Sequence, residues 1–205
     1  MQCLYDLDHG TDKLILIQSV ILMGFWYTDP QDHTGAWYWI GIAITLSQAL
    51  GLHRCPQLDN RSQRLPEAQQ PLVRRIWWTC IVRDRWLSLA KGRPMRIHHD
   101  DCDVPMPSGE DIFLELDNIP KRARDKFVPT EANLLAEMWI DLVKISATLG
   151  KILRIHYCVT GPKPAVEEIN ASAEELRMCK PHKVSNDNAS DLLLLHGYHV
   201  ELFYE

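Results

Sequence analysis

Hydrophobic positions along this chain of 205 residues recur with helical spacing, and polar or proline-rich segments divide them into blocks. The first block, residues 14–26, is apolar at almost every position, which predicts a helix buried on all sides and capped at Thr11. The second block, residues 34–53, places Trp39 and Ala43 one turn apart on the same face. These two blocks predict a pair of packed helices.

The third block predicts a long helix with a well-marked end. It begins near Glu67, after the polar and turn-rich residues 55–66, which are expected to form a loop. It runs to Lys91, where Gly92 supplies a natural helix-ending position and Pro94 prevents the helix from resuming.

Residues 95–129 show no convincing period and contain five prolines or glycines that break the pattern. They predict one long loop, with a short helical turn near Ile112. Residues 121–126 in this loop are basic, but they lack interleaved aromatic residues, so a solvated loop is a better interpretation than a nucleic-acid patch.

The longest helix is predicted at residues 131–157, with Thr130 as its cap. Its apolar positions follow steps of three and four residues, which is typical of a seam between packed helices: Leu135, Met138, Leu142, Ile145, Leu149, Ile152 and His156.

Two shorter helices are predicted at residues 165–178 and from about residue 190 to the last residue. No strand-like alternation of useful length occurs. The sequence therefore predicts an all-α fold, an irregular multi-helix bundle of about five or six helices with one long loop. We expect residues 1–205 to form part of one domain, truncated at both ends.

Composition and charge exclude several classes of protein. With 46% hydrophobic and 24% charged residues and a net charge of -5, the chain does not have the basic character of a nucleic-acid binder. Its longest apolar run, residues 14–27, is shorter than the ~20 residues that span a membrane. The six cysteines are too far apart in the sequence for a zinc or redox motif, so we expect no metal or cofactor in this chain.

Asp84 occupies an unusual position on the third helix, because helical phasing places it among apolar neighbours. A buried carboxylate without a partner is strongly disfavoured, so we predict a bidentate pair with a guanidinium. Arg93, in a loop that folds back after Gly92, is the expected partner. We interpret Asp84 as a structural staple between helix and loop rather than as a general acid or base.

Residues 98–103 read His-His-Asp-Asp-Cys-Asp and contain several groups that bind metals. In an extended segment, successive side chains point to opposite sides, so these groups would not converge on one ion. We favour a solvated acidic strip, and a metal-dependent helical enzyme that uses the strip is the weakest alternative. Catalytic residues are not predicted, because the chain lacks the common phosphate-loop, nucleophile-elbow and paired-cysteine motifs.

Four groups of residues follow one another along the chain and form what we call the structural signature: Leu50, Gly51, Leu52, His53 and Arg54; Arg74, Arg75, Ile76, Trp77 and Trp78; Asp84 and Arg85 with Gly92, Arg93 and Pro94; and Asp101, Cys102, Asp103 and Val104 with Pro107. In this order the motifs resemble the fungal-specific transcription factor domain, the regulatory middle region of fungal zinc binuclear cluster transcription factors. Residues 149–153 and 195–199 also resemble later helices of that family.

The resemblance implies a non-enzymatic all-α regulatory domain in a nuclear protein, C-terminal to a zinc cluster that binds DNA. Such a domain is expected to modulate transcription through contacts with transcriptional co-regulators or with other domains of its parent. This chain contains no cysteine cluster, so zinc and DNA binding are expected only in a separate domain of a parent protein. No membrane association is expected.

A second interpretation is a helical receptor domain that senses a small-molecule effector. Its pocket would be lined by Trp26, Trp37, Trp39 and Met138. Large apolar side chains of this kind commonly line ligand pockets.

Overall fold

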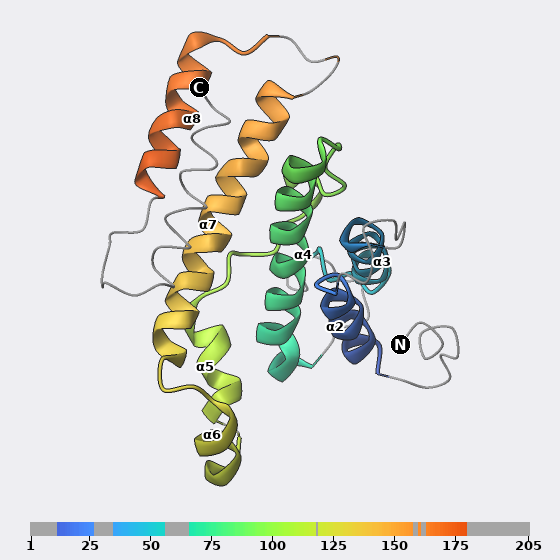
Figure 1. Ribbon diagram of the computed structural model, residues 1–205, viewed down its shortest axis with the longest axis vertical. Coiled ribbons are helices and arrows are strands. Elements are labelled where there is room, and N and C mark those ends of the chain that lie inside the picture. The colour runs from blue at the N-terminus through green and yellow to red at the C-terminus, as the bar shows by residue number, and fades with distance from the viewer. Residues whose placement is uncertain are drawn as a thin grey trace. The chain divides into compact units, whose positions relative to one another are not determined.

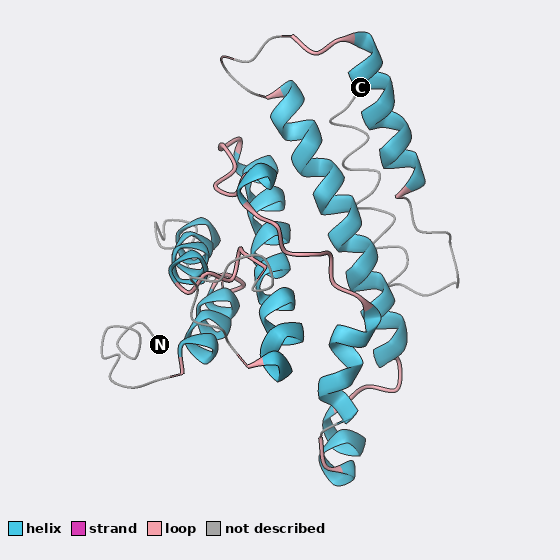
Figure 2. Cartoon of the chain, turned by 180° about the vertical axis from the view of Figure 1, so that it is seen from behind, coloured by secondary structure: helices cyan, strands magenta, loops and turns pink. Residues whose placement is uncertain are grey.

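The computed structural model contains helices and no strand in the part of the chain that it describes, which confirms the all-α fold (Figure 1, Figure 2). Helices α2 (Lys13–Met23), α3 (Ala36–Ala49) and α4 (Gln70–Lys91) belong to one compact unit, Met1–Met106. Helices α5 (Gly109–Asp117), α6 (Lys121–Phe127), α7 (Ala132–His156) and α8 (Val166–Met178) belong to a second unit, Pro107–Glu205. The described residues are 12–26, 35–55, 66–117, 119–157, 160 and 163–179.

In the first unit, α2 packs against both α3 and α4, and α3 packs against α4. Helix α2 buries Leu14 and Ile17, whereas Leu22 is 66% exposed, so the prediction of a helix buried on all sides was wrong. Its N-cap is Asp12 rather than Thr11, because the Asp12 carboxylate accepts a hydrogen bond from the backbone N–H of Leu14 (2.9 Å).

Helix α3 is shorter than predicted. It ends at Ala49 with Leu50 as C-cap, and the chain then turns through Gly51, whose φ of +73° lies in the left-handed region. His53 and Arg54 therefore belong to the turn after the helix rather than to its last turn. Trp39 and Ala43, which were predicted to share one face, are both buried.

Helix α4 follows the prediction closely. A short 3₁₀ turn, η1 (Glu67–Gln69), precedes it, and Pro71 lies in its first turn. The helix ends at Gly92, which adopts φ +59°. The backbone N–H of Arg93 donates to the carbonyl of Ser88 (3.0 Å), which turns the chain back after the helix.

The segment from residue 93 to residue 106, called here the return segment, contains one 3₁₀ turn, η2 (His99–Asp101). Ile97 is buried, and the Trp78 indole Nε1–H donates to the carbonyl of Pro105 (2.8 Å). The return segment is therefore attached to α4 at both its beginning and its end.

The second unit contains two helices that the sequence prediction assigned to a long loop. Helix α5 covers the helical turn expected near Ile112, and it begins where the Asp111 carboxylate accepts from the Ser108 N–H (2.8 Å). Helix α6 follows Pro120, and its basic residues lie on a helix, not in a loop. No residue of α6 is buried, so its sequence carries no apolar period.

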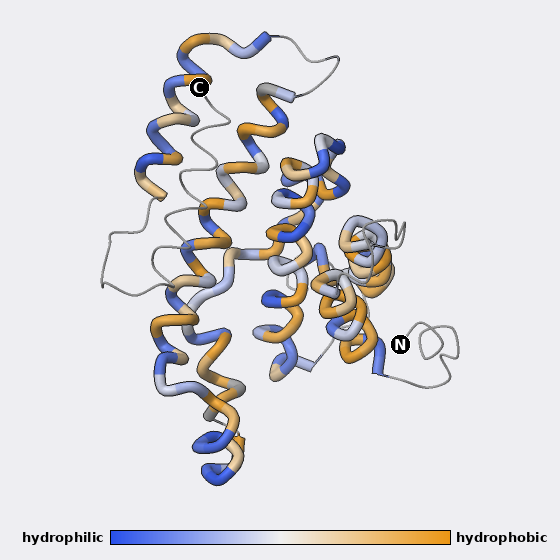
Figure 3. Tube along the Cα trace, viewed as in Figure 1, coloured by the Kyte–Doolittle hydropathy of each residue, from blue (hydrophilic) through white to orange (hydrophobic). Residues whose placement is uncertain are grey.

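Helices α7 and α8 pack against each other, and α5 packs against α7. Orange and blue segments alternate along α7 and α8, as expected for amphipathic helices (Figure 3). Ile145, Leu149 and Ile152 are essentially inaccessible, which agrees with the predicted seam, but Leu135 is 46% exposed and lies outside the core. Thr148, which is not one of the predicted seam positions, is also buried.

The start of α7 and the end of the chain also bear on the predictions. Glu131 occupies the N-cap position of α7 and makes no side-chain cap, so Thr130 is not the cap. Helix α8 begins one residue after its predicted start and ends at its predicted end. The side chain of His156 and the predicted last helix lie outside the described residues. Within those residues, no helix combines the length and apolar character needed to cross a membrane.

Candidate functional site

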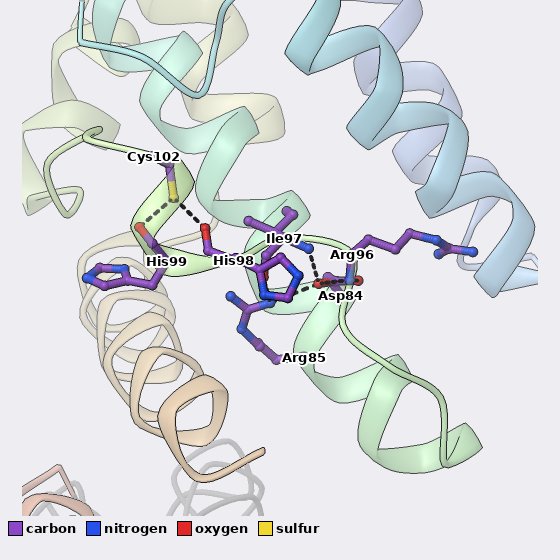
Figure 4. Close-up of polar contacts among 7 residues, drawn as sticks. All are labelled: Asp84, Arg85, Arg96, Ile97, His98, His99 and Cys102. Carbon is purple, nitrogen blue, oxygen red and sulfur yellow. Dashed lines mark hydrogen bonds and ion pairs between the residues drawn. The ribbon is translucent and has the colours of Figure 1, made fainter. Parts of the chain in front are cut away.

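The centre of the first unit is a buried carboxylate on α4. Asp84 is fully buried, and its Oδ2 accepts hydrogen bonds from Arg85 Nη1 (2.8 Å) and from the backbone N–H of Ile97 (3.1 Å). The backbone N–H of Arg96 lies 3.2 Å from Oδ1 and 3.1 Å from Oδ2. We call these four residues, Asp84, Arg85, Arg96 and Ile97, the Asp84 clasp (Figure 4).

The guanidinium that pairs with Asp84 comes from Arg85, which corrects the prediction of Arg93. Arg85 is 4% exposed, and its Nη1 also donates to the carbonyl of Ile97 (2.7 Å). Adjacent helix residues do not usually face each other. Here the Ile97 carbonyl supplies a second acceptor beside the carboxylate, so Arg85 reaches both from one position. The return segment does fold back onto Asp84, as predicted, but through backbone groups.

Burial opposes ionisation of both members of this pair. Burial raises the pKa of Asp84, and the Ile97 N–H, Arg85 and the Arg96 N–H counteract part of that rise. Burial lowers the pKa of Arg85, and Asp84 counteracts part of that fall. Each charge is therefore tolerated in the interior only while the other is present. Removing one partner leaves the other as an uncompensated buried group.

The Asp84 clasp has the chemistry of a staple. The carboxylate receives three N–H donors from the protein itself, and Arg85 bridges it to a backbone carbonyl. A general acid or base must reach the proton that it transfers. With its oxygens occupied by internal donors and fully buried, Asp84 holds the return segment against α4.

A second junction joins two of the signature motifs. The backbone N–H of Asp103 donates to the carbonyl of His53 (3.3 Å). In the opposite direction, the Asp103 carboxylate accepts from Arg54 Nε (3.2 Å) and from the backbone N–H of Cys55 (2.5 Å). The turn after α3 and the end of the return segment are thus fixed to each other by side-chain and backbone bonds.

The tryptophan pair of α4 contacts both segments that meet at this junction. Trp77 is 1% exposed, and its ring lies 5.8 Å from the ring of His53, measured between centroids. Burial lowers the pKa of His53, with a further contribution from Arg54, while Asp103 opposes the shift. Trp78 is buried and holds the return segment through Pro105. Trp78 therefore supports the return segment, and Trp77 supports the turn after α3.

The remaining signature residues occupy varied environments. Leu52 is buried, Arg74 and Arg75 are half-buried on α4 and each contacts other groups, and Asp101 is exposed. Pro107, which is buried, opens the second unit. These positions are structural supports or surface positions rather than members of one cluster. Gly92, Arg93 and Pro94 are exposed at the turn that follows α4.

The strip at residues 98–103 does not bring its ligand-type side chains together. His98 and His99 are exposed, and the thiol of Cys102 lies 3.5 Å and 3.4 Å from their backbone carbonyl oxygens (Figure 4). Burial raises the pKa of Cys102. Within the described part of the chain, no three His, Cys, Asp or Glu side chains are grouped to hold a metal ion.

The three tryptophans of the predicted ligand pocket lie in three different environments. Trp26 is 73% exposed, Trp39 is 6% exposed and meets Tyr38 edge-on, and Trp37 lies under the guanidinium of Arg96. Met138 is half-buried on α7 in the second unit. A pocket lined by all four side chains stays a prediction.

Two contributors to the Asp84 clasp were missed by sequence reasoning. Arg96 and Ile97 act through their backbone N–H groups, and Ile97 also through its carbonyl. Backbone groups are present at every position, so no residue type signals this role. The sequence indicated only that a buried Asp84 needs hydrogen-bond donors and that a segment folding back after Gly92 is in a position to supply them.

Comparison with known proteins identifies a related family. A family model described as "Fungal specific transcription factor domain" matches residues 2–178. The chain is 43% identical over 113 residues to "Cutinase transcription factor 1 beta" of Fusarium vanettenii, which covers 55% of this chain and 12% of that protein. It is 34% identical over 166 residues to a "Transcription factor" of Fusarium pseudograminearum, covering 78% and 18%.

A third relative is the "Acetamidase regulatory protein" of Aspergillus oryzae, which is 32% identical over 104 residues, 49% of this chain and 13% of that protein. The chain thus spans less than a fifth of the length of each of these three relatives. No solved structure matches the chain.

Proposed function

The chain belongs to the fungal-specific transcription factor domain family, and on that premise we propose that it is a non-enzymatic regulatory domain of a nuclear transcription factor. It modulates DNA-templated transcription through contacts with co-regulators or with other domains of its parent. DNA reading and zinc binding belong to a separate domain of the parent, and this segment makes no direct contact with nucleic acid.

The observation that supports this proposal is the construction of the Asp84 clasp. The most specialised residues of the chain are used to hold the return segment on α4, with the carboxylate engaged by internal donors. A segment held in this way presents a defined surface to a partner at low entropic cost. Contacts made by that surface, rather than chemistry at Asp84, are the basis of the regulatory activity.

A transcription reporter tests this proposal. Residues 1–205 are fused to a heterologous DNA-binding domain in a fungal nucleus, and the reporter signal is compared with that of the DNA-binding domain alone. We expect the fusion to change the signal and Asp84→Asn, which removes the buried charge, to diminish that change. Asp141→Asn, in the exposed Lys144–Asp141 pair of α7, is the matched control. A fusion that leaves the signal unaltered at normal protein abundance contradicts the proposal.

The effector-sensing interpretation differs in what stabilises the domain. A small molecule that binds the folded state raises the unfolding temperature by mass action, without any other protein present. A thermal-shift screen with small metabolites therefore separates it from regulation by protein contacts. A metabolite that raises the unfolding temperature in proportion to the logarithm of its concentration favours sensing.

A further inference from the structure

Arg96 contributes to the Asp84 clasp through its backbone N–H. Its side chain extends away from the clasp and lies over α3. Its guanidinium carbon lies 3.6 Å from the centroid of the Trp37 ring, and that of Arg93 lies 5.3 Å from the same centroid. Both distances are within the range of cation–π attraction. We call Trp37, Arg93 and Arg96 the cationic platform.

Helix α3 leaves space for the Arg96 side chain at Gly41. Gly41 lies one turn after Trp37 on α3, and a Cβ atom placed there would lie 3.1 Å from Cζ of Arg96 and 3.3 Å from one of its terminal nitrogens. A side chain at position 41 would therefore force the guanidinium to move. The absence of a side chain at Gly41 lets Arg96 lie across the helix surface and against the face of Trp37.

The position of Arg96 is fixed at both ends. Its backbone N–H is bound by the buried Asp84 carboxylate, and its side chain is held by Trp37 and Gly41. The guanidinium is thus largely ordered before any partner arrives. An ordered cation loses less conformational entropy on binding an anion than a free surface arginine does.

The platform carries positive charge that no carboxylate neutralises within the described residues. Neither Arg93 nor Arg96 forms an ion pair there, and Nη1 of Arg96 is buried without a hydrogen-bond acceptor. Burial lowers the pKa of Arg96; Asp84 opposes this shift and the like charge of Arg93 adds to it. Two cations that lie over one ring, repel each other and have no ion-pair partner among the described residues favour an anionic partner.

We propose that the cationic platform docks an acidic peptide segment of a partner protein. Guanidinium groups bind carboxylates through paired hydrogen bonds. This inference rests on the proposed function, because it assigns one surface and one class of partner to regulation by protein contacts.

Nucleic acid fits this surface less well than a short peptide. Duplex DNA carries a charge about every 1.7 Å, and binding to it requires an extended basic track. The platform offers two guanidiniums, in a chain whose net charge is -5. A short segment with a few carboxylates matches this limited number of cations.

Fluorescence anisotropy with the whole chain tests the proposal. The probe is a fluorescein-labelled peptide of alternating glutamate and leucine, and the comparison peptide has glutamine in place of every glutamate. We expect the acidic peptide to bind, the glutamine peptide to bind weakly or not at all, and salt to weaken binding. The double variant Arg93→Gln/Arg96→Gln should weaken binding about tenfold, as expected for two partly exposed charge pairs.

Two further variants separate docking from general charge. Gly41→Leu retains every charge but puts a bulky side chain where the Arg96 guanidinium lies, so it should weaken binding of the acidic peptide. Arg122→Gln removes an exposed arginine of α6 and should leave binding unchanged. Circular dichroism identifies any variant that has lost its helices. Unchanged affinity in the folded double variant overturns the proposal, as does equal binding of both peptides.

A labelled DNA oligonucleotide tests the competing class of ligand. If DNA displaces the peptide and its own binding is lost in Arg93→Gln/Arg96→Gln, the platform binds nucleic acid and the proposal is overturned. The binding assay does not measure transcription. A platform that fails to bind the peptide while the reporter fusion remains active therefore counts against docking alone, and peptide binding with an inactive reporter fusion counts against the proposed function alone.

Discussion

The two units of the molecule are stabilised in different ways. In the first unit, the two members of a fully buried ion pair on α4, Asp84 and Arg85, hold the return segment through hydrogen bonds to backbone groups of Arg96 and Ile97. In the second unit, α7 and α8 meet through apolar residues, and two ion pairs of these helices, Lys151–Glu175 and Lys144–Asp141, are partly exposed. Specific residue types are needed to build a buried clasp, whereas many apolar sequences can build a helix seam. The chemistry specific to this chain is therefore concentrated in the first unit.

The largest expected effect comes from removing the buried carboxylate. Asp84→Ala leaves the buried charge of Arg85 uncompensated and the N–H groups of Arg96 and Ile97 without their acceptor, so it should lower the free energy of unfolding by about 3–5 kcal/mol. Urea denaturation followed by tryptophan fluorescence measures the change. Asp141→Ala, which removes an exposed pair, should cost less than about 1 kcal/mol. Equal losses in the two variants would remove the distinction between the units.

The seam of the second unit should respond to a change in packing. Leu149 is fully buried on α7, so Leu149→Ala should cost about 2–5 kcal/mol through lost burial and the cavity that remains. Leu135→Ala is the matched control, because Leu135 lies on the same predicted seam but is 46% exposed. Thermal unfolding followed by circular dichroism should place the control near the wild type. A large loss of thermal stability in Leu135→Ala would show that Leu135 belongs to the packed seam, as the sequence predicts.

The turn that begins the return segment should show a smaller effect. Gly92 has φ +59°, and a Cβ atom there would meet nothing within 4 Å, so Gly92→Ala tests backbone conformation without a steric clash. The left-handed conformation should cost about 1–2 kcal/mol for alanine. Gly92→Asn should cost less, because asparagine tolerates this region better. Chemical denaturation of both variants measures the difference, and equal stability of alanine and glycine would show that the turn readily relaxes.

The smallest expected effect is a pH dependence in the first unit. Burial and Arg54 lower the pKa of His53 from its ordinary value of 6.5, so the folded state favours the neutral ring. Its contribution to stability should be present above pH 6.5 and lost as the pH falls from there through the lowered folded-state pKa. His53→Gln should flatten the dependence of the free energy of unfolding on pH in this window. An identical slope in the variant would assign the pH dependence to other groups.

The helices were predicted best where their signals are local. The end of α4 at Gly92 follows from one residue that tolerates positive φ and a proline two positions later. The α6 helix was missed because none of its residues is buried, so no apolar period marks it. The predicted cap of α2, Thr11, was wrong by one residue: the cap is Asp12. Both side chains are able to cap a helix, so the sequence did not separate them.

The candidate site was predicted in part. The burial of Asp84 and its attachment to a segment that folds back after Gly92 follow from helical phasing and from the cost of an unpaired charge. The identity of the guanidinium does not, because Arg85 and Arg93 carry the same group and the choice depends on where the Ile97 carbonyl lies. The placement of Arg96 over Trp37 likewise depends on the path of the return segment, which no local pattern encodes.

Hydrogen exchange tests most directly whether Asp84 holds the return segment in place. In the wild-type protein, the amides of Arg96 and Ile97 should be protected from exchange, because both donate to the buried carboxylate. In Asp84→Asn, protection should fall at these two amides and remain unchanged in the middle of α7. Rapid exchange of the Arg96 and Ile97 amides in the folded wild-type protein, or equal protection in the variant, would contradict the account.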